Sequence, residues 1–131
     1  MRPRFRELRV SDFFDIEMTE YDRRKRHFLL ANTLALQEVV ENPFCFAMVA
    51  GRPIGLGGVT PTHEIWGVAS PEIGLHMLRF TRYVRKMMEF YGRPVWATVA
   101  HENPAGARWA STLGMRRTKV GSNGWDTWAV C

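Results

Sequence analysis

The chain has 131 residues, a formal net charge of +5, and hydrophobic side chains at 46% of its positions. This balance is typical of one globular domain, and it predicts a single domain over residues 1–131. No stretch approaches the roughly 20 apolar residues that cross a bilayer, and no apolar run follows the basic first residues, so we expect neither a membrane partner nor a signal peptide. The basic charge permits nucleic acid, an acidic protein or an anionic cofactor as a partner, but selects none of them.

The order of secondary structure follows from apolar periodicity and from the residues that end each run. Strands show alternating or continuous apolar residues, and helices show a stripe at 3.6-residue spacing. The pattern predicts β-α-α-β-β-β-α-β-α-β-β, with strands at 5–10, 44–49, 54–59, 63–69, 95–100, 116–120 and 125–131 and helices at 13–18, 24–40, 70–91 and 103–114.

Three glycines interrupt the predicted strand at 54–59. Gly55, Gly57 and Gly58 indicate a bulge or a close approach of backbone. They do not open a helix in a G-x-G-x-x-G pattern, so we do not expect a dinucleotide fingerprint.

The two cysteines and four histidines carry little chemistry by themselves. Cys45 lies between two phenylalanines and is predicted to be a small core residue, and Cys131 ends the sequence. Their number indicates no disulfide framework, and no His or Cys spacing is typical of a metal site, so we predict no metal.

A segment near the C-terminus carries the first family resemblance. Asn103 is followed by the small residue Gly106 three positions on and by Gly114 eleven positions on. This spacing and the order of elements resemble the GNAT acyltransferases. The resemblance implies an α/β domain with a mixed central sheet of about six or seven strands, flanked by about four helices. The family's tyrosine position is occupied by Ala110.

The resemblance also implies a place for acetyl-CoA, whose pyrophosphate would lie on backbone amides at the start of the helix after the fourth strand. Here Pro71 removes a donor, Glu72 adds negative charge, and only Gly74 of the family's glycines is present. The candidate cofactor-binding residues are Ile73, Gly74, Leu75, His76 and Asn103.

Acyl transfer to an amine requires a base for the amine and an acid for the departing thiolate. Glu64 and His63 are the candidate bases, although a polar pair at the start of a strand is equally typical of a solvent-exposed position. Ala110 supplies no acid, which leaves a water or a phenol such as Tyr83 or Tyr91. We therefore predict no catalytic residues with the full family chemistry.

A second resemblance involves residues 79–91, the strand V95-W-A-T-V99, Asn103 and W109-A-S-T-L-G114, with R9-V-S-D-F13 near the start. This path is similar to the internal virion protein A family of T7-like podophages. It implies a bacteriophage morphogenesis protein of the host cytoplasm and phage particle, with other phage structural proteins as partners and no cofactor.

Three functions thus remain open. The preferred one is a virion-associated protein on a GNAT-like scaffold without the acetyltransferase reaction. The alternative is a divergent acetyl-CoA-dependent N-acetyltransferase. The second alternative is a nucleic-acid-binding module that uses Arg79, Arg82, Arg85 and Lys86, although such a basic run is also typical of a solvated helix face. Trp125 or Trp128 is expected to mark a contact surface.

Overall fold

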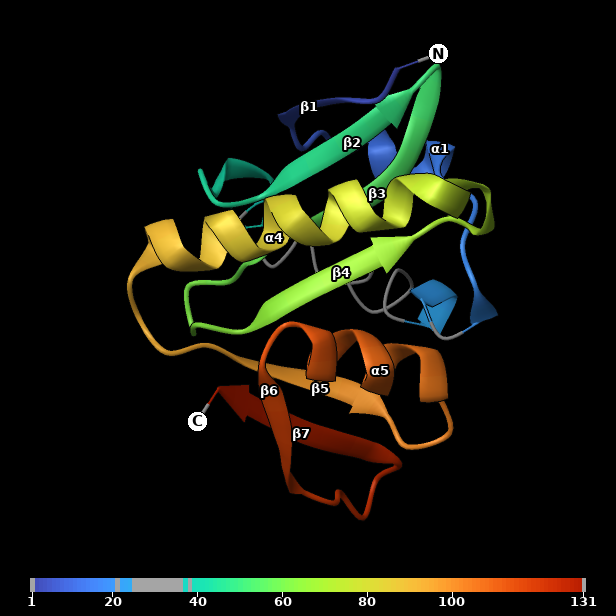
Figure 1. Cartoon of the computed structure of the whole chain (residues 1–131). Coiled ribbons are helices and arrows are strands. Elements are labelled where there is room, and N and C mark those ends of the chain that lie inside the picture. The colour runs from blue at the N-terminus through green and yellow to red at the C-terminus, as the bar shows by residue number, and fades with distance from the viewer. Residues whose placement is uncertain (1, 21, 25–36, 38, 131) are drawn as a thin grey trace.

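The computed structural model describes residues 2–20, 22–24, 37 and 39–130. The described strands form two sheets (Figure 1). The first sheet has the order β1-β2-β3-β4 and the second has the order β5-β7-β6, and neighbouring strands within each sheet are antiparallel. The strand bounds are β1 Arg4–Glu7, β2 Phe46–Ala50, β3 Arg52–Val59, β4 Ile65–Ala69, β5 Trp96–Ala100, β6 Met115–Lys119 and β7 Trp125–Val130.

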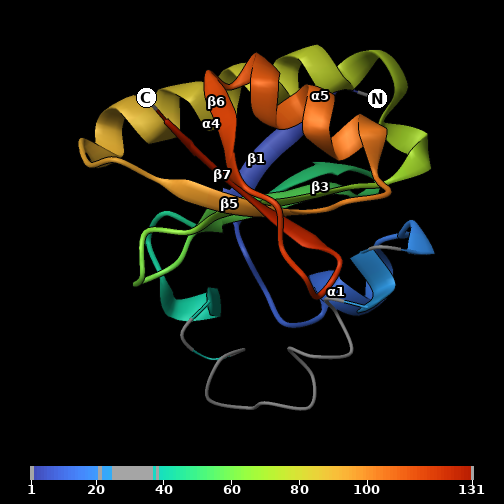
Figure 2. The ribbon, with the colours of Figure 1, turned by 90° about the horizontal axis from the view of Figure 1, so that it is seen from below.

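Helices cover both faces of this strand layer. Figure 2 shows α4 (Met77–Tyr91) and α5 (Pro104–Thr112) on one face and α1 (Asp12–Asp15) on the other. The helix expected at 24–40 lies mostly outside the described residues. No helix in the described part of the chain is long and apolar enough to cross a bilayer. The predicted α/β class is confirmed, with the strands divided between two sheets.

Two apolar clusters lie on the two faces of the first sheet. Phe46, Phe80 and Val84 belong to the cluster beneath α4 and α5. Phe13 and Cys45 belong to the cluster on the α1 side. Cys45 is buried as predicted, and burial raises the pKa of its thiol to about 11, despite hydrogen bonds that act in the opposite direction.

The glycines of β3 allow close packing on both faces. A Cβ atom on Gly55 would lie 2.8 Å from the ring of Phe80, and one on Gly58 would lie 2.8 Å from the Cα of Cys45. The close backbone approach predicted from the glycine pattern is therefore confirmed, because larger side chains at these positions would displace the neighbours.

The helix expected at 70–91 is interrupted. A 3₁₀ segment, η1 (Pro71–His76), precedes α4, and the two are separated by Gly74 with φ 48° and ψ −126°. Ser70 accepts a hydrogen bond from the Glu72 amide at 3.1 Å, as an N-terminal cap does. The prediction of one helix over 70–91 is wrong, because a continuous helix cannot contain a residue in the conformation of Gly74.

The carboxylate of Asp12 anchors the start of α1. It accepts hydrogen bonds from the Arg9 amide at 2.8 Å and from both terminal nitrogens of Arg6 at 2.6 and 2.9 Å. These contacts raise the pKa of Arg6. Ser11, the residue before α1, makes no side-chain cap hydrogen bond, and Asp12 fixes this turn to β1.

Candidate functional site: a gap between two parallel strands

The two sheets meet where β4 and β5 begin. A parallel bridge pairs Glu64 with Trp96, and the Trp96 amide donates to the His63 carbonyl at 3.1 Å. No other pairing between β4 and β5 is present among the described residues, so the strands part beyond this point. The edge of β4 that faces β5 therefore has no strand partner along most of its length, and its backbone groups remain available to a ligand.

A groove of about 690 Å³ opens on the α4 and α5 side of this gap. Its walls come from β4, the first turns of α4, and α5. Arg108 of α5 is the one cation among the described lining residues, and Glu20 and Asp22 add carboxylates from the segment that follows α1. The groove thus has a basic wall and an acidic end.

Trp109 forms the floor of the groove. Its ring lies against the backbone of Gly67, where an added Cβ would come within 2.7 Å of the indole. The indole stacks on Phe80 with ring centroids 6.0 Å apart, and its Nε1 donates to Thr81 Oγ1 at 3.2 Å. The Trp109 side chain therefore connects α5, α4 and β4 at the point where β4 and β5 separate.

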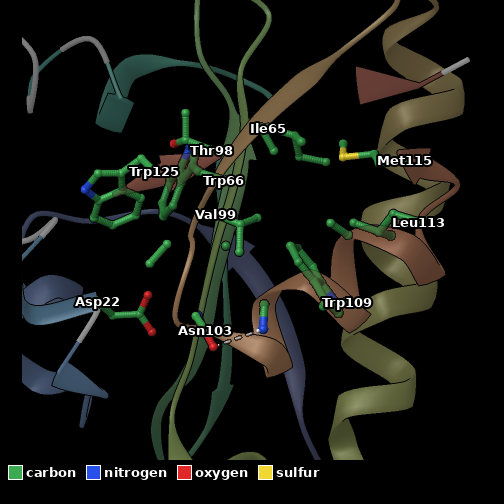
Figure 3. Close-up of a pocket in the computed structure, with 15 residues that line it drawn as sticks. Asp22, Ile65, Trp66, Thr98, Val99, Asn103, Trp109, Leu113, Met115 and Trp125 are labelled. Carbon is green, nitrogen blue, oxygen red and sulfur yellow. Dashed lines mark hydrogen bonds between the residues drawn. The ribbon is translucent and has the colours of Figure 1, made fainter. Parts of the chain in front are cut away.

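A smaller cavity of about 60 Å³ occupies the gap itself (Figure 3). Trp66, Thr98 and Trp125 line it together with Asp22, and Trp66 stacks on Phe13 of α1 at 5.9 Å. On the opposite side the lining includes Gly67, Trp109, Ala110, Leu113 and Met115. Since its lining comes from both faces of the strand layer, this cavity extends from the α1 side toward the large groove on the α5 side.

Of the predicted cofactor residues, only Asn103 lines the large groove, and residues 73–76 precede Met77 and Leu78, which do line it. Ile73 is buried in the core, Gly74 makes the turn, Leu75 is 97% exposed, and His76 precedes α4 without capping it through its side chain. The first-turn amides of α4 thus have no side-chain acceptor from this position. Asn103 lines both cavities, and its Oδ1 accepts from the Gly106 amide at 3.1 Å to cap α5.

Glu72, which lies in this turn, has an ion-pair partner. Its carboxylate pairs with Arg52 at the start of β3, and Arg52 also contacts Glu17 at 3.3 Å. The negative charge of Glu72, which was expected to oppose an anion at this turn, therefore has a cationic partner. The ion pair offsets part of that charge.

The candidate acid and base residues separate into three places. Glu64 lies at the closed end of the gap, where Thr98 Oγ1 donates to its Oε2 at 3.4 Å. The His63 ring and the Tyr91 hydroxyl form a hydrogen bond at the C-terminal end of α4. None of Glu64, His63 and Tyr91 is among the residues that line the two cavities, although Thr98, the partner of Glu64, lines the smaller one. Tyr83 stacks on Phe5 of β1, far from the gap along α4.

Ala110 leaves the gap without the phenol that the family pattern carries. Its side chain is 3% exposed and lines the small cavity. The position is therefore the right one for a group acting in the gap, but its methyl group cannot transfer a proton.

Sequence reasoning did not identify Gly67, Thr81 or Asp22. A glycine within a predicted strand and a threonine within an apolar helix stripe were available signals for the first two. Asp22 lies in a charged run with no distinguishing pattern.

No family model and no curated protein sequence matches this chain. Solved structures do. Protein PH1933 of Pyrococcus horikoshii OT3 has a TM-score of 0.71 and 12% identity, with 98% of both chains covered. The PaiA N-acetyltransferase of Thermoplasma acidophilum, solved in complex with coenzyme A, has a TM-score of 0.69 and 13% identity, with 99% of both chains covered. The fold is that of the GNAT acetyltransferases.

A third structure is the ribosomal-protein-S18-alanine N-acetyltransferase of Escherichia coli. Its TM-score is 0.62 at 12% identity, and the match covers 98% of this chain and 93% of that one. At such identities the likeness concerns the fold.

These structures correct two expectations. The preference for a virion protein without acetyltransferase chemistry is wrong, because the structures that share this fold include N-acetyltransferases. The expectation of no cofactor is also wrong, since one of them holds coenzyme A. The types of the residues in the turn before α4 and at position 110 do not reveal the gap between β4 and β5, which the tertiary structure forms. The resemblance to the internal virion protein A family receives no support from these structures.

Proposed function

We propose that this chain is an acyl-CoA-dependent N-acyltransferase, with acetyl-CoA as donor and a cationic primary amine as acceptor. The observation that carries the proposal is the cavity in the gap between β4 and β5, which is lined from both faces of the strand layer. A donor in the large groove and an acceptor on the α1 side can meet there. The fold shared with N-acetyltransferases supports the same reading.

The lining residues fit coenzyme A. The unpaired edge of β4 offers backbone donors and acceptors to its amide-bearing arm, as an exposed strand edge does for a peptide. The Met77 amide already donates to the Gly74 carbonyl, so the later amides of the first turn of α4 and the guanidinium of Arg108 are the groups that suit its phosphates. When bound, the cofactor supplies an acyl group activated as a thioester.

The acceptor side suits a protonated amine. Trp66 and Trp125 provide aromatic faces and Asp22 a carboxylate, all lining the small cavity. Indole faces and carboxylates both attract an ammonium group. We assign Glu64 as the base that takes the proton from this amine, because it lies at the closed end of the gap beside Thr98. Water is left as the proton source for the thiolate, since Ala110 replaces the phenol.

Calorimetry with acetyl-CoA tests the first half of the proposal. We expect micromolar binding that free CoA competes away. Release of free thiol in the presence of primary amines tests the second half, with neutral alcohols as the comparison. No binding at saturating acetyl-CoA contradicts the proposal, and binding without thiol release for any amine contradicts the transfer step.

Substitution of Glu64 by Gln tests the assigned base. We expect kcat to fall about 100-fold or more while the acetyl-CoA dissociation constant stays unchanged. Glu7→Gln, at an exposed position on β1, is the matched control and should change neither. An unchanged kcat in Glu64→Gln removes Glu64 from the reaction.

A further inference from the structure

A second groove, separate from the gap between β4 and β5, lies between α4 and β1. It measures about 460 Å³. We call it the basic groove, and its lining residues are Phe5, Arg79, Arg82, Tyr83, Arg85, Lys86 and Glu89.

Positive charge dominates the basic groove. Arg79, Arg82 and Lys86 form ion pairs with no carboxylate in the described part of the chain, and Glu89 is the one acid in the lining. The spacing of these three cations places them along one side of the helix, over about 10 Å at 1.5 Å rise per residue. Arg85 also lines the groove and donates to the Thr112 carbonyl of α5.

An aromatic pair lies among these cations. The rings of Tyr83 and Phe5 are stacked with centroids 3.9 Å apart and planes 5° from parallel. Tyr83 remains 37% exposed even though it also contacts Phe46, with centroids 4.6 Å apart. The basic groove therefore combines a row of cations with the Tyr83 ring, which is partly exposed and is held in place by its stacking on Phe5.

We propose that the basic groove binds single-stranded nucleic acid, with the row of cations on consecutive phosphates and a base stacked at Tyr83. Arginine side chains match phosphate oxygens through their planar fork, and an aromatic ring stacks on any exposed base. A duplex offers the phosphates but keeps its base faces covered. An acidic protein segment offers carboxylates but gains nothing from the ring.

The basic groove and the large groove beside β4 lie on different sides of α4. Leu78 and Thr81 line the large groove, whereas Arg82 and Lys86 line the basic groove. The two can be occupied together, so this inference does not depend on the proposed transferase activity.

Fluorescence anisotropy with short labelled single-stranded oligomers, one of DNA and one of RNA, tests the proposal with the full chain. We expect binding at about 50 mM salt that weakens as salt rises, with a slope of about −0.7 per contacted phosphate. The double variant Arg82→Gln, Lys86→Gln should reduce that slope by about 1.4. The control double variant Arg116→Gln, Lys119→Gln removes two exposed charges from β6 and should leave the slope unchanged.

The ring is tested by a matched pair of substitutions. Tyr83→Phe keeps an aromatic ring and should bind as the unchanged chain does. Tyr83→Leu should weaken binding about 5- to 100-fold with the salt slope unchanged. Thermal unfolding of both variants verifies that each is folded at the assay temperature.

Four outcomes would overturn the proposal. These are no anisotropy change at low salt, equal loss in the control double variant, equal affinity for a duplex of the same sequence, and full competition by polyglutamate at equal charge. The last of these would indicate an acidic protein partner instead. These measurements need no variant that removes a buried side chain.

Discussion

The contact between Gly67 and Trp109 leads to the most specific prediction. In Gly67→Ala, the new Cβ would lie 2.7 Å from Cη2 and 3.1 Å from Cζ3 of the Trp109 indole. The indole is rigid and is held from its other side by Phe80 and Thr81, so it must rotate toward the open groove. We expect the alanine variant to be less stable than the unchanged chain.

The magnitude follows from the contacts that the rotation breaks. The loss of the Nε1 hydrogen bond to Thr81 costs about 0.5–1.5 kcal/mol, and the loss of stacking on Phe80 costs a similar amount. The lower chain entropy of alanine in the unfolded state offsets about 0.4–1 kcal/mol. The net expectation is a decrease of about 1–2 kcal/mol in the free energy of unfolding, or roughly 4–8 °C in Tm.

Urea unfolding of a double-mutant cycle checks the cause. Trp109→Leu removes the ring that the new Cβ would meet, so Gly67→Ala in that background should be neutral or stabilising. The difference between the two effects should therefore reach about 1–3 kcal/mol. An equal loss of stability in both backgrounds would show that the Gly67–Trp109 contact is not the reason, and the account of the groove floor would be wrong.

Three further predictions concern charge and reactivity. Arg108→Ala should weaken CoA binding about 3- to 10-fold in calorimetry, whereas Arg116→Ala, outside the groove, should not. Desolvation acts to raise the pKa of Asp126. Hydrogen bonds from His101 and the Gly121 amide outweigh it, together with the charges of His101 and Arg117, and the pKa of Asp126 is lowered. Because the folded-state pKa is depressed, the resulting stability is present above the ordinary value of 3.8 and is lost as pH falls below it. Urea titrations of the unchanged chain and Asp126→Asn should therefore converge at acid pH. In a Cys131→Ser background, a thiol reagent at about pH 8 should label Cys45 only upon unfolding, since its pKa of about 11 and its burial both suppress the thiolate, and prompt labelling would contradict this.

Local sequence patterns determined the element order and several turns of this chain. The helix predicted at 103–114 corresponds to α5, which Asn103 caps, and Gly114, with φ 85°, occupies a left-handed position just after its end. Alternation and apolar runs predicted every described strand to within a few residues. These features depend on neighbours within about four positions, which is the range over which capping, φ preference and periodicity act.

Only the tertiary structure decided the site. The separation of β4 from β5, the place of the Trp109 indole on Gly67, and the pairing of Glu72 with Arg52 each join residues that are distant in the sequence. Residue types predicted Glu64 as a base and Ala110 as a missing donor, but not that Glu64 contacts Thr98, which lines the cavity between the strands. The physical reason is that a strand's pattern specifies which face is apolar, whereas strand separation depends on the side chains packed from α4 and α5.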